Sequence, residues 1–301
     1  MIEVGPWVPC GAKEMAKVFK SHQKLADLPL TEEQAQQMLS AAVKEVRRTV
    51  MARRLMPLFG PLGAGVESVS METISQEDAS AEVHLEGLPD PSPISMHAQE
   101  EYVRIPIIYK DFILHWRDVK FSNDLGSPLD MSNAVRAAHQ VGHAEDNLLF
   151  NGCKDLGING LLTCSDSHTL KSEDWSKDGA CVKSIYSAMD KLLESNHHFP
   201  YALIVSVDMY RMLLKPVQDR PVLELEQVSK VLSDGVFWSS QIPAGTAALV
   251  STGAQNFDIA VAEDLQIAYL GPREMNYHFR VYQSLVPRIK RPTAVCLIKQ
   301  G

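Results

Sequence analysis

The chain has 301 residues, of which 45% are hydrophobic and 22% are charged, as in an ordinary globular protein. Its formal net charge of −8, from 37 acidic and 29 basic residues, argues against a protein that binds polyanions. The five cysteines are scattered without a CxxC pair, which argues against a zinc ribbon or a disulfide framework and favours a reducing cytosol.

Residues 1–30 form an irregular leader that the sequence assigns to no element. The leader lacks a basic stretch followed by an apolar core, so we expect no signal peptide. Apolar runs elsewhere are shorter than the ~20 residues that cross a bilayer, and we therefore expect a cytoplasmic protein. Thr31-Glu-Glu-Gln34 is a capping-box pattern, and it predicts one helix that continues to Pro57. Four arginines near its far end suit the negative end of the helix dipole: Arg47, Arg48, Arg53 and Arg54.

Residues 58–104 differ in composition from the rest of the chain. Their apolar residues are thinly spread among Ser and Glu, too few to bury against one another. The segment is also far longer than an ordinary connection of about 4–6 residues. It is either disordered or an extended arm completed by a neighbouring subunit. Its glycine-rich start, Gly60–Gly65, lacks the Gly-Lys-Ser/Thr ending of a P-loop, so a flexible turn is the better interpretation than a phosphate cradle.

An apolar run from Ile105 to Asp118 leads through a hinge at Gly126–Asp130 into a long helix, which we predict over residues 128–150. Pro128 suits a first helical turn, and Asn151-Gly152 is a C-terminal stop signal. Apolar residues recur at helical spacing and predict one continuous apolar face: Val135, Ala138, Val141, Ala144, Leu148 and Leu149.

The second half of the chain mixes helices and strands without a regular βαβ repeat, which predicts an α+β fold. A polar loop is expected over 165–176, and helices are expected over 177–195 and 208–214. A proline-bracketed loop follows over 215–221. Strands are expected over 201–207, 247–251, 257–262, 266–270, 279–287 and 294–298.

A metal site is the one candidate for catalytic chemistry. His139 and His143 are four residues apart on the long helix, and Asp146 follows three residues later. One helix supplies at most half of a bundle-type site, and no Glu-x-x-His pair is present there. We therefore interpret these side chains as polar groups on an exposed flank, and we predict no catalytic residue and no bound metal.

A series of short stretches nevertheless matches one known family in its own order. They are Arg53–Arg54, Gly60–Val66, Ile105–Asp118, Glu145–Asp146, Phe150, Gly152, Gly157–Leu161, Ser233–Val236, Val250–Gly253, Tyr269–Gly271 and Arg288–Lys290. In this set the chain closely resembles the encapsulins of the linocin (family 1) type, the shell proteins of nanocompartments. The resemblance covers residues 31 to about 298.

The resemblance implies the tailed-phage major-capsid fold of the Hong Kong 97 type, with a peripheral domain, an extended loop and an axial domain. Residues 31–57 would be the N-terminal helix of the peripheral domain, and 58–104 the extended loop, which adds strands to a neighbouring subunit. The other boundaries that it implies are 105–162 for the peripheral domain with the long helix, 163–252 for the axial domain, and 253–301 for the returning strands of the peripheral domain.

The resemblance also implies two functional sites. In the family, a cargo protein carries a short terminal peptide that docks on the inner shell wall. The corresponding positions here are Val46, Val50, Arg53, Asp264, Leu265 and Ile267. Arg53 and Asp264 would hold polar ends of the peptide, and the other four would hold its apolar side chains. The proline-bracketed loop corresponds to the loop of the five-fold pore, whose residues would be Val217, Gln218, Asp219 and Arg220.

The function that follows is a self-assembling icosahedral shell, not an enzyme, that encloses a cargo enzyme and gates small solutes through pores. Relatives most often enclose ferritin-like iron oxidases or peroxidases, so iron storage is the expected role. Some members bind a flavin; no cofactor site is assigned here, and neither nucleic acid nor membrane is expected as a partner. Two alternatives stay open: a prophage major capsid protein that packages nucleic acid, and a metalloenzyme that uses His139 and His143.

Overall fold

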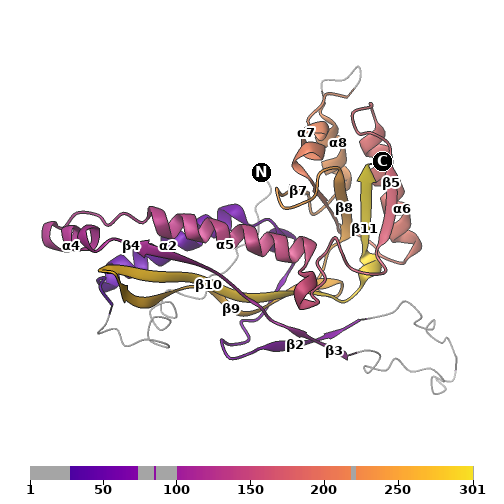
Figure 1. Cartoon of the computed structure of the whole chain (residues 1–301). Helices are drawn as coiled ribbons and strands as arrows, with labels where there is room; N and C mark the ends of the chain where they lie inside the picture. The colour runs from indigo at the N-terminus through magenta and orange to yellow at the C-terminus, as the bar shows by residue number, and fades with distance from the viewer. Residues whose placement is uncertain (1–27, 74–84, 86–99, 218–221, 301) are drawn as a thin grey trace. The chain divides into compact units, whose positions relative to one another are not determined.

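The computed structural model describes residues 28–73, 85, 100–217 and 222–300 (Figure 1). Most of the predicted leader and most of the predicted extended loop therefore lie outside the described residues. The chain divides into two compact units. Unit 1 comprises Met1–Thr49, Ile107–Gly142 and Glu263–Gln283, and unit 2 comprises Val50–Pro106, His143–Ala262 and Ser284–Gly301.

Helix α2 of unit 1 runs from Glu32 to Thr49 and begins as predicted. The Thr31 N–H donates to the Gln34 side chain at 2.9 Å, and the Gln34 N–H donates to the Thr31 hydroxyl at 3.2 Å. These two reciprocal bonds are the capping box expected from the sequence. The buried face of α2 consists of Ala35, Met38, Leu39, Ala42 and Val46.

The predicted continuation of this helix to Pro57 is wrong. Helix α2 ends at Thr49, and a separate short helix, α3, runs from Ala52 to Leu55. The Met51 and Ala52 N–H groups donate to the Asp146 carboxylate at 3.0–3.1 Å instead of to carbonyls of a continuing helix. A side chain distant in sequence therefore separates the two helices.

The long helix is present as α5, Ser132–Asn151, four residues shorter at its start than predicted. Asp130 accepts a bond from the Ser132 N–H at 2.9 Å, so the acidic residue precedes the helix instead of lying inside it. The helix ends at Asn151, one residue beyond the predicted end and within the predicted stop signal, and Gly152 follows with a φ of +71°. A Cβ on Gly152 would lie 2.3 Å from the Ile158 carbonyl oxygen, so only glycine fits this stop.

The predicted apolar face of α5 is correct in part. Ala138, Val141, Leu148 and Leu149 are buried, but Ala144 is exposed. Two carboxylates, Glu145 and Asp146, are buried instead. Their partners are described below.

A four-stranded sheet has the order β1-β9-β10-β4. Its strands are β1 (Leu58–Phe59), β9 (Phe257–Arg273), β10 (Asn276–Ile289) and β4 (Ile107–Leu114). The two strands predicted within 257–270 are one strand, because β9 runs through the polar Glu263 and Asp264 without a break. In unit 1, Phe112 of β4 stacks on Phe279 of β10 with 5.4 Å between the ring centroids.

The described part of the predicted extended loop begins alongside β9. The Leu62 and Gly63 N–H groups donate to the carbonyls of Val261 and Ala262 at 2.9 Å, so the glycine-rich turn lies against a strand edge. Strands β2 (Ser68–Glu72) and β3 (Glu100–Arg104) then form a two-stranded antiparallel sheet. We call residues 58–104 the arm, and β2–β3 the base of the arm.

A five-stranded sheet in unit 2 has the order β5-β11-β8-β6-β7. Its strands are β5 (His168–Ser172), β11 (Val295–Gln300), β8 (Thr246–Ser251), β6 (Tyr201–Val205) and β7 (Val236–Trp238). The polar loop predicted over 165–176 is wrong in its centre, because β5 pairs in parallel with β11. Helix α6 (Ala180–Glu194) packs on this sheet, and α7 (Val207–Leu213) and α8 (Glu224–Val231) complete the described helices of the region (Figure 1).

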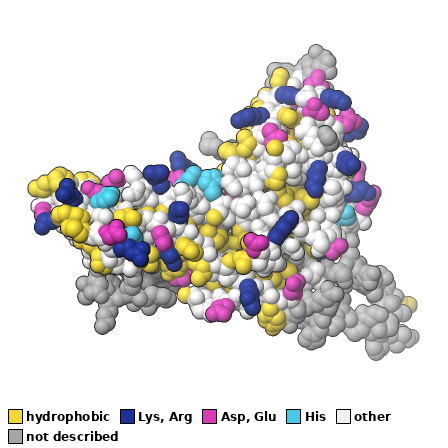
Figure 2. All heavy atoms as spheres, in the orientation of Figure 1, with side chains coloured by type: hydrophobic (Ala, Val, Ile, Leu, Met, Phe, Trp, Pro, Cys, Tyr) yellow, Lys and Arg dark blue, Asp and Glu magenta, His cyan; other side chains and the backbone are white. Residues whose placement is uncertain are grey.

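Unit 1 exposes apolar side chains on β4 and on helix α4, Trp116–Leu125. Figure 2 shows hydrophobic side chains gathered where α4 lies in Figure 1. We call this set the β4–α4 surface; its exposed fractions range from 39% to 68% over Ile107, Tyr109, Ile113, Phe121 and Leu125. No helix among the described residues is both long enough and apolar enough to span a membrane.

Candidate functional site

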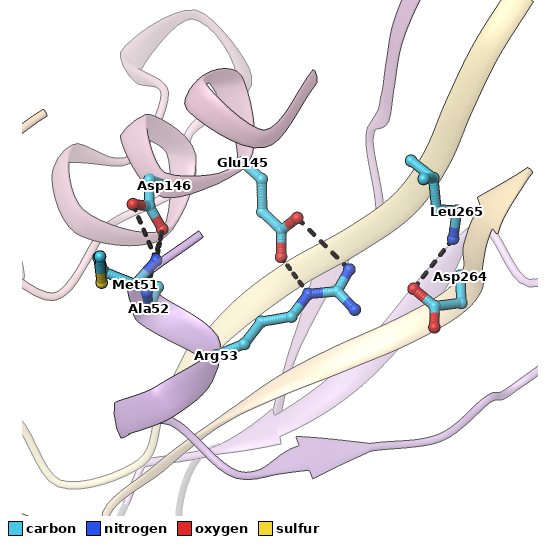
Figure 3. Close-up of polar contacts among 7 residues, drawn as sticks. All are labelled: Met51, Ala52, Arg53, Glu145, Asp146, Asp264 and Leu265. Atoms are coloured by element: carbon cyan, nitrogen blue, oxygen red, sulfur yellow. Dashed lines mark hydrogen bonds and ion pairs between the residues drawn. The ribbon is translucent and has the colours of Figure 1, made fainter. Parts of the chain in front are cut away.

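Two of the predicted peptide-docking residues lie at α3: Val50 is in the short segment before this helix, and Arg53 is within it. Two consecutive carboxylates of α5, Glu145 and Asp146, hold α3 and the segment before it within unit 2 (Figure 3). Both carboxylates are buried, with exposed fractions of 0% and 1%. Buried carboxylates are costly unless paired or hydrogen-bonded, so their partners show what they stabilise.

Glu145 forms an ion pair with Arg53. The Arg53 Nε donates to Glu145 Oε1 at 2.5 Å, and Nη2 donates to Oε2 at 3.4 Å. The Arg53 side chain is 12% exposed, so the pair is shielded from water on both sides. Two parallel bonds fix the plane of the guanidinium as well as its charge.

Asp146 provides the acceptor for the start of α3. It receives the Met51 and Ala52 N–H groups, and the Ser239 hydroxyl donates to its Oδ2 at 3.1 Å. Burial raises the pKa of Asp146 to about 6, against the opposing effect of the bonds donated by Ala52 and Met51. The sequence contains a signal for this role, since Glu145 and Asp146 occupy positions where the apolar stripe of α5 would otherwise continue.

Four of the six predicted docking residues have apolar side chains, and all four are buried in the single chain. Val46 on α2 is 5% exposed, and Val50 is 2% exposed. Leu265 and Ile267 on β9 are 6% and 5% exposed. Side chains this deeply buried expose little apolar surface to a peptide in the single chain.

The two polar docking residues already have partners inside the chain. Arg53 is paired with Glu145, as described above. Asp264 of β9 is half-buried, and its Oδ1 accepts the N–H of the next residue, Leu265, at 2.9 Å (Figure 3). Val50 and Arg53 belong to unit 2, whereas Val46 and the three β9 residues belong to unit 1. The assignment of these six residues to a peptide-docking site stays a prediction.

The predicted pore loop lies between α7 and α8. Gln218, Asp219 and Arg220 are outside the described residues, and only its base can be described. The Val217 N–H donates to the Val222 carbonyl at 2.8 Å, and the Glu224 N–H donates to the Lys215 carbonyl at 2.9 Å. These bonds close the base of the loop, whose role at a pore stays a prediction.

Glu224 ties the base of that loop to α6. Its carboxylate is 2% exposed and accepts the Gly179 N–H at 3.0 Å and the Cys181 thiol at 2.6 Å. Burial raises the pKa of the Cys181 thiol above its usual value, and the neighbouring Glu224 carboxylate raises it more. Cys181 is therefore a hydrogen-bond donor here and not a nucleophile.

The two histidines proposed for the metalloenzyme alternative have separate partners. His139 Nδ1 lies 3.0 Å from Glu45 Oε1, and His143 Nδ1 lies 3.0 Å from the Gln241 side-chain nitrogen. Asp146, the third member of the set, accepts backbone N–H groups. Over the residues that the structure describes, no three His, Cys, Asp or Glu side chains are placed to hold a metal ion.

Comparison of the sequence with known proteins gives consistent matches over most of the chain. The model of the Linocin_M18 family, described as "encapsulating protein for peroxidase", matches residues 21–286. A type 1 encapsulin shell protein, EncA, of Myxococcus xanthus is 37% identical over 91% of this chain and 95% of its own length. A diheme-cytochrome–encapsulin shell fusion protein of Kuenenia stuttgartiensis is 33% identical over 91% of this chain and 75% of its own.

Comparison of the structure with solved structures identifies the fold. The virus-like particle protein of Pyrococcus furiosus aligns with a TM-score of 0.70 at 20% identity, over 88% of this chain and 98% of that one. The capsid protein of the myovirus phage XM1 aligns with a TM-score of 0.59 at 12% identity, over 81% and 90%. The predicted α+β phage-capsid fold is therefore confirmed.

Proposed function

This chain belongs to the encapsulin family that the Linocin_M18 model describes, and from that premise we propose that it is the structural subunit of a closed, icosahedral protein shell. Copies of one chain close into such a shell through repeated contacts between different surfaces of each subunit. The match to the Myxococcus xanthus shell protein, at 37% identity over nearly the full length of both chains, is the observation that carries the proposal.

Two features of the single chain support assembly. The β4–α4 surface leaves large apolar side chains in water, and exposed groups of this kind commonly mark contacts with another protein. Among the described residues, the base of the arm has two strands, and its Tyr102 is 67% exposed. The exposed side chains of both regions become buried if a neighbouring copy covers them and the arm adds its strands to a sheet of that copy.

The shell encloses a cargo protein that docks through a short terminal peptide. The docking site comprises Val46, Val50 and Arg53 together with Asp264, Leu265 and Ile267. Support for these positions comes from the match to the family. For the cargo we propose a ferritin-like, iron-storing enzyme in a cytoplasmic compartment, and for solute passage a pore lined by residues 217–220.

Purification of the full chain from its native host, followed by nuclease treatment and electron microscopy, tests this proposal. We expect closed particles that contain a second protein and retain iron. Particles filled with nuclease-resistant nucleic acid would support the phage-capsid alternative, which has the same fold. Small oligomers without closed particles would contradict both.

The docking site has its own test. The terminal 20 or so residues of the enclosed protein, fused to a fluorescent protein, serve as the probe in co-expression. We expect Asp264→Asn to reduce fluorescence per particle several-fold, because the half-buried carboxylate proposed to hold a polar end of the peptide is lost. Arg54→Ala, an exposed position beside Arg53, is the control and should load normally. Equal loading in both variants would contradict the assignment of Asp264.

A further inference from the structure

Arg288 on β10 lies at the centre of a buried charge cluster in unit 2. Its Nε and Nη2 donate to the two oxygens of Asp258 on β9, both at 2.7 Å. The side chains are 9% and 4% exposed. Lys290 donates to the same carboxylate at 2.7 Å, so Asp258 would keep one cation if the guanidinium were removed.

The same guanidinium also reaches the arm. Its remaining nitrogen, Nη1, donates to the Ser70 carbonyl of β2 at 3.2 Å. Ser70 is opposite Tyr102 of β3, and β2 and β3 are the two described strands of this sheet. The Arg288 guanidinium carbon also lies 4.1 Å from the centroid of the Phe59 ring on β1. One planar group thus joins the strands β9 and β10 to both the first and the second strand of the arm.

Arg280, eight residues earlier on β10, provides a natural comparison. It too forms a forked pair with a carboxylate, Asp111, at 2.6 and 3.0 Å, and it too lies 4.1 Å from a ring centroid, that of Tyr109. However, Arg280 and Asp111 are 35% and 46% exposed, and these contacts join β10 only to β4. The two arginines share their chemistry and differ in burial and in contact with the arm.

We propose that Arg288 is a positioning residue for assembly: it fixes the direction in which the arm leaves the body of unit 2. The proposal rests on the proposed function, since a fixed arm matters when it must reach the same place on every neighbouring copy. Lysine at this position keeps a positive charge beside Asp258. It cannot donate to Asp258 in a fork, reach the Ser70 carbonyl and lie flat on Phe59 at the same time, because its charge is a single point at the end of a flexible stem.

The test compares Arg288→Lys and Arg288→Met with Arg280→Lys and Arg280→Met in the full chain. Hydrogen exchange is measured in peptides that cover residues 66–73 and 100–105, together with thermal unfolding and particle diameters by electron microscopy. We expect Arg288→Lys to unfold close to the wild-type temperature while the arm-base amides exchange about tenfold faster, because local opening becomes easier. The particles should then vary in diameter or remain incomplete.

The Arg280 variants should leave both arm-base exchange and particle diameter unchanged. The proposal is overturned if Arg288→Lys leaves both readouts unchanged, or if the Arg280 variants alter them equally. If Arg288→Met fails to fold, Arg288→Lys still tests the proposal. Hydrogen exchange is read on the subunit itself, so it tests Arg288 even if the wild-type chain forms no shell, an outcome that would contradict the proposed function alone.

Discussion

Strand β6 of the five-stranded sheet buries every one of its side chains, from Tyr201 to Val205. Strand β4 of unit 1 buries only Phe112 and Leu114, although six of its eight residues are apolar. The difference lies in their surroundings. Strand β6 has β8 and β7 as neighbours and is part of a core completed by α6 and α8, whereas β4 is the last strand of its sheet.

The comparison distinguishes regions whose apolar side chains are covered by the same chain from regions whose apolar side chains stay exposed in a single chain. The core of the five-stranded sheet is closed by side chains of unit 2 alone, including Trp175 and Leu192, each 0% exposed. The β4–α4 surface has no such cover among the described residues of unit 1. Substitutions in the first region should therefore change the stability of the subunit, and substitutions in the second should change its assembly. Four predictions test this division, ordered by their effect on the free energy of unfolding.

The largest effect is expected for Leu203→Ala in the centre of β6. Leu203 is 0% exposed, and removing it leaves a cavity that the surrounding sheet and helices cannot fill. The free energy of unfolding should fall by about 4 kcal/mol, as measured by denaturant titration of dissociated subunits. Ile107→Ala on β4 is the matched control, with an expected change within about 0.5 kcal/mol. Similar losses in the two variants would remove the basis of the division.

Arg53→Met tests whether the contacts of α3 stabilise the single subunit. The substitution leaves the buried carboxylate of Glu145 without its cation, and we expect a loss of about 3 kcal/mol. Arg54→Met, at the exposed neighbouring position, should cost less than about 0.5 kcal/mol. Adding Glu145→Gln to Arg53→Met should recover part of the loss, because the buried negative charge that lost the Arg53 guanidinium is then removed. No recovery would mean that the pair contributes through packing and not through charge.

The pH dependence of stability should trace to His197, which is 5% exposed beside the five-stranded sheet. Burial lowers its pKa to about 4, and the nearby charges of Arg291, His168 and His198 act in the same direction. Because the folded state holds this imidazole neutral, its contribution is complete above a pH of about 6.5 and is lost as the pH falls toward 4. We expect on the order of 1–2 kcal/mol over this interval.

The measurement is the difference between the unfolding free energies of the wild type and of His197→Gln at several pH values. The difference removes the contribution of Asp146, whose raised pKa acts in the opposite sense by favouring the folded state as the pH falls. His198→Gln, at the exposed neighbouring position, removes the smallest of the three nearby charges and should change the pH profile only slightly. A His197→Gln profile as steep as that of the wild type would show that another group is responsible.

The smallest effect on subunit stability, within about 0.5 kcal/mol, is expected for Ile107→Ser combined with Phe121→Ser. Both side chains are already exposed, at 63% and 57%, so they gain little further contact with water when the subunit unfolds. Assembly should nevertheless require a subunit concentration higher by about tenfold or more, since apolar contact between copies is lost. Mass photometry over a dilution series measures this. Lys120→Ser on α4 is the control, and unchanged assembly of the double variant would mean that the β4–α4 surface faces water in the shell.

Local signals in the sequence were sufficient where a structure is decided within a few residues. The capping box from Thr31 to Gln34 is present as predicted, and so is the helix end at Asn151-Gly152. Strand β6 was also predicted, since its apolar run is continuous. The family and its fold could be identified for a different reason, because the ordered set of short stretches extends over nearly the whole chain.

The structure decided what depends on residues far apart in sequence. The break between α2 and α3 depends on Asp146, 95 residues from Met51. The polar segment 168–172 becomes a strand because β11, at the other end of the chain, offers it an open edge. Likewise, the sequence contains Arg280 and Arg288 as equivalent residues, and only the fold buries one of them against the arm. A hydrogen bond or an ion pair between distant segments forms only after the chain has folded, so the sequence pattern around either partner does not reveal it.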